Sequence, residues 1–365
     1  MKVPFLDLKI RGKERDILIS SVERVFNHGR LVMGPEIEDL EQKLATYCSR
    51  KYAVAVGSGT DALFLGLKAL DIGPGDEVIT TSLSWIATAN AIALTGAKPV
   101  FADINNDLNI DYKSVEKLIS ENTKAILVVN FTGRICDMDE LCNLARQHKI
   151  KLVEDGSQSF GATYKERKCG SFGDLSAISH NPMKIFGACG ESGSITCDKK
   201  EIYERLVSLR YNGTINREVC IEPSLNGRMD TLQASILLER LKTFESIISR
   251  RRVNAEFYNK SLSKYVEIPE SSSDRSDVYY TYTIKAKQRD ELKDFLNSQG
   301  IETKIQHPKL MSKQPAYKSF LSSTPKADEL VKNILCIPVH EKLTQKELDY
   351  VVKSFHLFFN SKYKK

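Results

Sequence analysis

Short apolar runs alternate with helical stretches through the first half of the chain, and this alternation limits the possible folds more than any other feature. The predicted strands lie at 52–56, 77–81, 98–104, 125–131 and 151–155. The amphipathic segments between them lie at 60–70, 88–94 and 139–149. Strands that alternate with helices build a parallel sheet whose faces the helices cover. The sequence therefore predicts an α/β fold with a mostly parallel central sheet flanked by helices.

The order of elements changes after the longest helical pattern, at 231–252. A predicted strand at 279–285 is followed by a helix at 289–300, a strand at 301–305 and a terminal helix at 347–359. This order is typical of a smaller α+β domain.

The length of 365 residues suits two domains. We predict a large α/β domain over residues 1–245 and a small C-terminal α+β domain over residues 246–365. The start of the chain, to about residue 15, is expected to pack on the small domain.

The composition excludes several classes of protein. Hydrophobic residues make up 41% of the chain and charged residues 27%, which is ordinary for a globular enzyme. The net charge is +6, but the basic residues are scattered, so nothing predicts nucleic-acid binding. No stretch approaches the roughly 18 apolar residues of a membrane span, and the N-terminus lacks the apolar core of a secretory leader. The eight cysteines form no CxxC pair. We expect a cytosolic protein with reduced thiols.

A glycine turn, GSGTDAL at 57–63, follows the first predicted strand. The N–H groups at the start of the next helix, with the hydroxyls of Ser58 and Thr60, would bind a phosphate. The same spacing fits a dinucleotide-binding GxGxxG/A turn or a plain tight turn. A dinucleotide fold requires an acidic residue at the end of the next strand, where this chain has Ser82 and Leu83. The phosphate interpretation is therefore favoured over a nicotinamide dinucleotide.

Two further predicted strand ends carry candidate residues. The only tryptophan, Trp85, follows the strand at 77–81, where it serves either as a core residue or as a flat platform for a planar ring. Asp155 ends a buried strand, where a carboxylate requires a partner such as a protonated ring nitrogen. Capping of the next helix is the alternative role for Asp155. Gln158 offers an amide to a ring oxygen.

Lys184 lies in HNPMKIFGACGESGS, after a segment without other charges and before an apolar strand. A lysine is usually solvated, but a desolvated lysine has a lowered pKa, and its free amine forms a Schiff base with an aldehyde. A phosphate cup, an aromatic platform, an acid for a ring nitrogen and an amine for an aldehyde are the requirements of pyridoxal 5′-phosphate. Successive strand ends supply all four, so we predict this cofactor and no metal.

The chain resembles the DegT-type sugar aminotransferases, which are fold-type I enzymes that use pyridoxal phosphate to aminate nucleotide-linked ketosugars. The resemblance extends from PFLDLK (4–9) and LVMGPEIEDLE (31–41) to ILCIPVHEKLT (334–344). Its motifs are GTDAL, GPGDEVITT, EDGSQSFGA, FGDL, PMKIFGACGESG and LNGRMDTLQA.

The resemblance implies a role for each matching residue. Lys184 would bind the cofactor aldehyde and later move the proton, and Asp155 would keep the ring nitrogen protonated. Gln158 would bond the ring oxygen, and Trp85 would stack on the ring. The residues that would hold the phosphate are Gly59, Thr60 and Ser179. Some relatives carry histidine at the lysine position and are dehydratases, but here the lysine is kept, which implies transamination.

The resemblance also implies a homodimer with active sites at the subunit interface. Asn226, in LNGRMD, matches an asparagine that family members lend to the phosphate of the neighbouring subunit. Arg228, in the same segment, matches a position that reaches the substrate in some members.

The chain departs from the family pattern where family members face the sugar. Arg134 lies in TGRICDMD (132–139), where many members have Gly-Gln-Pro, and either meets an acidic substrate group or lines the entrance. The frequent His-Tyr-Pro is here Gln306-His307-Pro308, which makes His307 a candidate substrate residue, and a later histidine is Ser312.

We expect ping-pong transfer from an amino acid, with L-glutamate favoured, to a nucleotide-linked ketosugar in surface-polysaccharide or related amino-sugar biosynthesis. The motifs resemble most the members that aminate a 3-keto sugar such as UDP-2-acetamido-3-oxo-glucuronate. The alternatives are a 4-keto aminotransferase of the same family and, more remotely, an NAD-dependent oxidoreductase or a non-catalytic regulator on the same fold.

Overall fold

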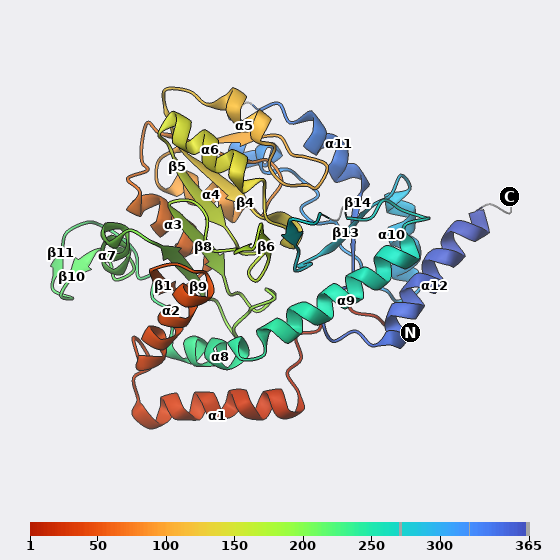
Figure 1. Ribbon diagram of the computed structural model, residues 1–365, viewed down its shortest axis with the longest axis horizontal. Coiled ribbons are helices and arrows are strands. Elements are labelled where there is room, and N and C mark those ends of the chain that lie inside the picture. Colours follow the sequence, from red (N-terminus) through yellow and green to blue (C-terminus); the bar gives the residue numbers. More distant parts are fainter. Residues whose placement is uncertain (270–271, 321, 363–365) are drawn as a thin grey trace.

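The fold is built around one large sheet. The computed structural model describes residues 1–269, 272–320 and 322–362 (Figure 1). Within these residues, seven strands form the sheet in the order β1 (Tyr52–Val56), β9 (Gly193–Cys197), β8 (Leu175–Ser179), β5 (Lys151–Asp155), β4 (Thr123–Val129), β2 (Glu77–Thr81) and β3 (Lys98–Ala102). The pairs from β8 to β3 are parallel, and only β9 runs antiparallel to its neighbours. The predicted mostly parallel sheet is confirmed.

Alternate side chains of each strand enter cores on opposite faces of the sheet. In β4, Ile126 and Val128 pack in one core, whereas Leu127 and Val129 pack in the other. The first core is covered by α2 (Pro35–Tyr47), α5 (Tyr112–Leu118), α6 (Met138–His148) and α8 (Thr231–Leu241). The second is covered by α3 (Gly59–Ala69), α4 (Ala87–Leu94) and α7 (Lys200–Leu209). Because both faces are buried, the centres of these strands are mainly apolar, which is why most of them could be found in the sequence.

A separate core lies beyond the sheet, and we call the elements that surround this core the C-terminal unit. It contains β13 (Tyr282–Lys285) paired antiparallel with β14 (Ile334–Ile337), together with α10 (Arg289–Ser298) and α12 (Gln345–Lys362). Val3 belongs to this core and pairs with Ile301, so the start of the chain lies on the C-terminal unit. The next helix, α1 (Gly12–His28), instead packs on α8 (Figure 1). The predicted boundary at 245/246 falls inside α9 (Phe244–Leu262) and stays a prediction.

The remaining elements are short. A three-stranded sheet contains β12 (Arg275–Ser276), β6 (Thr163–Tyr164) and β7 (Arg167–Lys168), and β10 (Thr214–Ile215) with β11 (Val219–Cys220) forms a hairpin. The last helix before β14 is α11 (Pro325–Asn333), which packs against loops of the large sheet. No helix among the described residues is long and apolar enough to span a bilayer.

Two predicted elements differ from the structure. The single helix predicted at 231–252 is two helices, α8 and α9, because the backbone leaves the helical conformation at Thr243 (φ −116°, ψ 5°). The strand predicted at 301–305 forms only isolated bridges. Ile301 pairs with Val3, whereas Lys304 pairs with Cys336, so no single neighbour extends a ladder along the segment.

Candidate active site

A cavity of about 770 Å³ lies where β1, β2, β5 and β8 end. Carboxyl ends of parallel strands meet at one edge of a sheet, and ligands bind there in α/β proteins. The opposite wall comes from the C-terminal unit, through Tyr280 and residues 304–308. The residues predicted from the sequence that line this cavity are Ser58, Gly59, Thr60, Trp85, Asp155, Gln158, Ser179, Lys184 and His307.

The start of α3 forms one end of the cavity. Ser58 caps this helix, and its Oγ accepts a hydrogen bond from the Asp61 N–H at 3.0 Å. The N–H groups of Gly59 and Thr60 have no acceptor within the part of the chain that the structure describes. A Cβ at position 59 would lie 2.5 Å from the Ser179 Cβ, so glycine allows the helix start to approach the end of β8. Free N–H groups at a helix N-terminus, beside hydroxyls, suit a phosphate.

Asp155 lies in the wall formed by β5. Its side chain is buried, and Oδ1 accepts a hydrogen bond from the Ser157 N–H at 3.0 Å. Burial raises the pKa of the Asp155 carboxyl, while the hydrogen bonds from Ser157 and the charge of Lys184 lower it. A protonated ring nitrogen would provide the opposite charge that a carboxylate at this depth requires. Asp155 therefore fits the pyridine nitrogen of pyridoxal phosphate.

Gln158 is fixed by the loop after β4. Its Oε1 accepts a hydrogen bond from the Thr132 N–H at 3.0 Å, which leaves Nε2 as the donor for a ring oxygen. Thr132 is held at φ 61°, an unfavourable conformation for a β-branched residue. The next residue, Gly133, has φ 104°, and a Cβ there would lie 2.6 Å from the Tyr280 N. The loop thus presses against the C-terminal unit and orients the amide.

Lys184 projects from the loop between β8 and β9. The loop is held by a hydrogen bond from Ala188 N to His180 O at 2.7 Å and by Phe186, which packs against Phe160 and Phe244. The Lys184 side chain is only partly buried, and its Nζ lies 4.9 Å from the ring centroid of Tyr280. Tyr280 was missed by the sequence reasoning, because a tyrosine within YYTYT carries no local signal of a site.

Trp85 and His307 are neighbours in the wall of the cavity. Trp85 is 61% exposed, and its ring centroid lies 5.8 Å from that of His307. Burial, together with the positive charges of Lys304 and Lys184, lowers the pKa of His307 to about 4. His307 is therefore neutral at pH 7. Its backbone has φ 53°, which is uncommon outside glycine and marks a constrained segment.

Asn226 and Arg228 lie outside this cavity. The Arg228 Nε donates a hydrogen bond to the Asn226 Oδ1 at 2.7 Å, and its guanidinium lies 4.4 Å from the ring centroid of Tyr211. The structure therefore does not bring either residue to the Lys184 of the same chain.

Arg134 also lies away from the cavity, which differs from both roles expected for it. Its side chain is buried, with Nε 3.7 Å from an oxygen of Asp107 and NH1 3.8 Å from an oxygen of Asp277. Both acids are far from Arg134 in sequence, so the pairing had no local signal. Arg134 thus joins the loops after β3 and β4 to the start of the C-terminal unit.

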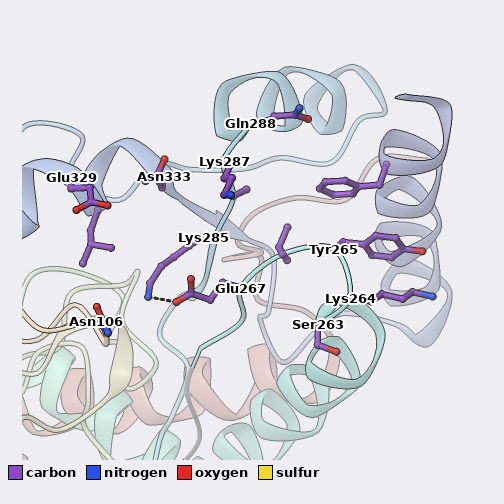
Figure 2. A pocket seen from close by; sticks show the side chains of 14 residues that line it. Asn106, Ser263, Lys264, Tyr265, Glu267, Lys285, Lys287, Gln288, Glu329 and Asn333 are labelled. Atoms are coloured by element: carbon purple, nitrogen blue, oxygen red, sulfur yellow. Dashed lines mark hydrogen bonds and ion pairs between the residues drawn. The ribbon is translucent and has the colours of Figure 1, made fainter. Parts of the chain in front are cut away.

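A second cavity, of about 1020 Å³, lies on the C-terminal unit and contains none of the predicted residues (Figure 2). Figure 2 shows Lys285 in an ion pair with Glu267 there, and Tyr265 on the far side. The chemistry predicted from the sequence is therefore assigned to the cavity in which Lys184 meets Asp155 and Gln158.

Comparisons with known proteins agree with this site. The model of the DegT/DnrJ/EryC1/StrS aminotransferase family matches residues 13–356. The UDP-2-acetamido-2-deoxy-3-oxo-D-glucuronate aminotransferase of Pseudomonas aeruginosa is 34% identical over 344 residues, which cover 93% of this chain and 96% of that protein. The crystal structure of DesV from S. venezuelae with a ketimine intermediate has a TM-score of 0.95 at 35% identity, with 98% of both chains covered. NtdA from Bacillus subtilis, solved with bound cofactor PMP, has a TM-score of 0.92 at 32% identity, covering 97% of this chain and 84% of that one.

Proposed function

The chain belongs to the DegT/DnrJ/EryC1/StrS aminotransferase family, and from this premise we propose that it moves an amino group from L-glutamate to a nucleotide-linked 3-ketosugar. It is an aminotransferase that uses pyridoxal 5′-phosphate. The observation that carries the proposal is the single cavity in which Lys184, Asp155, Gln158 and the start of α3 meet. The product would enter surface-polysaccharide or related amino-sugar biosynthesis.

Asp155 and Lys184 have different roles in the reaction. The cofactor, when bound, withdraws electrons from the carbon that bears the nitrogen and so acidifies its C–H bond. Asp155 holds the proton on the ring nitrogen, which the electron withdrawal requires. Lys184 Nζ would hold the cofactor aldehyde at rest. Once the amine of the donor amino acid replaces it there, the freed Lys184 amine would take the proton from the donor carbon and deliver one to the sugar carbon.

The other residues of the cavity hold and cover the cofactor. Gln158 donates through Nε2 to the ring oxygen, the N–H groups of Gly59 and Thr60 bind the phosphate with the Ser58 and Ser179 hydroxyls, and Trp85 covers one face of the ring. The fixed loops around Gln158 and Lys184 keep these groups in place between the two halves of the reaction.

We further propose a homodimer in which Asn226 binds the phosphate in the neighbouring subunit and Arg228 reaches its substrate. Asn226 is exposed, and Arg228 occupies its Oδ1, which leaves Nδ2 free to donate to an anion. The hairpin β10–β11 beside it extends away from the C-terminal unit (Figure 1). Ile215, Val219 and Ile221 are exposed there, as expected of side chains that a second copy covers.

The 3-keto position is supported by the Pseudomonas aeruginosa relative, whose name specifies a 3-oxo uronate. The alternative within the family is a 4-ketosugar. A panel of nucleotide ketosugars incubated with ¹⁵N-glutamate and the purified enzyme discriminates between them. We expect label at C3 of a 3-ketosugar and none with Lys184→Ala. Label only at C4 would contradict the proposed substrate and leave the aminotransferase assignment intact.

A further inference from the structure

An amino-acid donor always brings a carboxylate into the cavity, and a uronate sugar brings another. A carboxylate that leaves water needs an opposite charge or strong hydrogen bonds. The residues assigned to the cofactor do not meet this need, since Lys184 must remain reactive. The proposed function therefore raises the question of which side chain binds the substrate carboxylate.

Apart from the Arg228 that the neighbouring subunit would contribute, the charged residues that line the cavity within one chain leave one candidate. Besides Lys184 and Asp155, the cavity is lined by Glu191, Lys304 and the neutral His307. Glu191 carries the wrong sign for a carboxylate ligand, and its Oε1 accepts a hydrogen bond from Asn181 Nδ2 at 2.6 Å. Within residues 1–269, 272–320 and 322–362, the Lys304 amine forms neither an ion pair nor a hydrogen bond. Lys304 is thus a cation in the cavity with no partner in the chain.

The backbone fixes Lys304 in position. Its N–H donates to the Cys336 carbonyl at 3.0 Å, and its carbonyl accepts from the Cys336 N–H at 2.8 Å, so both of its backbone groups are bonded to β14. The side chain therefore starts from a rigid point on the wall opposite the strand ends. Lys304, Lys184 and His307 all line the same cavity, and the charges of the two lysines contribute to the lowered pKa of His307.

A neighbouring amide gives independent evidence of a ligand on this wall. Gln306 lines the cavity and is 3% exposed, yet its Oε1 has no hydrogen-bond partner among the described residues. Its Nε2 lies 3.2 Å from the His307 Nε2. A buried carbonyl oxygen without a donor is rare, so a ligand N–H or O–H is expected there. The wall thus offers a cation beside an unfilled acceptor.

We propose that Lys304 is the carboxylate-binding residue of the cleft, and that it determines which substrates the enzyme accepts. In a ping-pong reaction the donor and the sugar use the same space in turn, so one lysine serves the donor carboxylate first and a sugar carboxylate afterwards. This proposal rests on the proposed function for its sugar half only. Its donor half requires no more than aminotransferase activity.

The donor half is tested with Lys304→Met, which removes the charge and keeps the length, and Lys304→Arg, which keeps the charge. Lys309→Met is the control, since Lys309 is exposed on the same segment and does not line the cavity. The visible spectrum of the bound cofactor reports the half-reaction with L-glutamate, and calorimetry measures binding of glutarate, a dicarboxylate without an amine. For Lys304→Met we expect a KM for glutamate and a Kd for glutarate raised about tenfold, with kcat little changed. Lys309→Met should resemble the unmodified enzyme, and Lys304→Arg, which keeps the charge, should raise both constants less than Lys304→Met does.

The sugar half compares two nucleotide 3-ketosugars that differ only in a carboxylate or a hydroxymethyl group at C6. If Lys304→Met raises the KM for the uronate and leaves that for the other sugar unchanged, Lys304 contacts the sugar carboxylate. If only the KM for glutamate rises, Lys304 contacts the donor carboxylate. Unchanged constants for glutamate, glutarate and the uronate overturn the proposal, as does an equal loss with both sugars. Should the unmodified enzyme react with glutamate but with no nucleotide ketosugar, the proposed acceptor fails, and the glutamate and glutarate constants alone decide the role of Lys304.

Discussion

Gly59→Ala tests the phosphate site more sharply than loss of a polar side chain. The added Cβ would lie 2.5 Å from the Ser179 Cβ and 3.0 Å from its Cα, whereas ordinary contacts begin at 3.4 Å. Because these atoms belong to the backbone or lie next to it, β8 and the start of α3 must separate by about 1 Å. The N–H groups of residues 59 and 60 and the Ser179 hydroxyl would then no longer converge on one anion.

The expected effect follows from the bonds that this separation breaks. A hydrogen bond to a charged group contributes about 1.5–3 kcal/mol, so loss of one phosphate contact weakens cofactor binding by roughly 10- to 100-fold. The assay is titration of the apoenzyme with pyridoxal phosphate, followed by the fluorescence of Trp85. This residue is the only tryptophan and lines the cavity.

Gly73→Ala is the matched control. A Cβ there meets only the Thr95 carbonyl oxygen, at 3.8 Å, and the backbone needs no unusual φ. Equal cofactor affinity in Gly59→Ala, Gly73→Ala and the unmodified protein would refute the assignment of the helix start as the phosphate site.

Three further predictions concern the acid, the histidines and the subunit interface. Because burial raises the pKa of Asp155, ionisation of this carboxyl opposes folding at neutral pH. Asp155→Asn should therefore lower turnover about 100-fold or more, while its apo form melts no lower than the unmodified apo protein. A lower melting temperature of the apo variant would contradict the raised pKa. Burial lowers the pKa of His180 and His307 from 6.5 to about 4, so both bind protons more readily when the chain is unfolded. The free energy of unfolding should therefore fall as the pH drops from 6.5 toward 4. Replacing both histidines with Asn should make the free energy of unfolding, measured by urea denaturation, depend less on pH in this range. Mixed dimers of Lys184→Ala and Asn226→Ala subunits should regain about half of the normal activity, because one of the two shared sites is then intact; no recovery after subunit exchange would contradict the shared site.

The large sheet and the residues at its strand ends could be predicted because their signals are local. Strands buried on both faces are short apolar runs, and the residues after 56, 81 and 155 must lie at one edge once the strands are parallel. Asp155, Gln158 and Lys184 therefore line one cavity, as the sequence indicated. The strand at 175–179 was not predicted from the sequence.

The wall from the C-terminal unit could not be predicted in the same way. Tyr280 and Lys304 reach the cavity only because the chain returns to it about 100 residues after Lys184, through contacts with no sequence period. Arg134 follows a strand end as Gln158 does, but its side chain forms ion pairs with Asp107 and Asp277 and does not line the cavity. The break between α8 and α9 could not be predicted, because the residues there, Lys242 and Thr243, are neither glycine nor proline and both occur in helices.

The most direct measurement of the central claim is the site of covalent cofactor attachment. The holoenzyme is reduced with borohydride, digested, and its peptides are mapped by mass spectrometry. We expect the pyridoxyl group on Lys184 and on no other of the lysines. Attachment to a different lysine, or recovery of the Lys184 peptide unmodified from a yellow holoenzyme, would contradict the account.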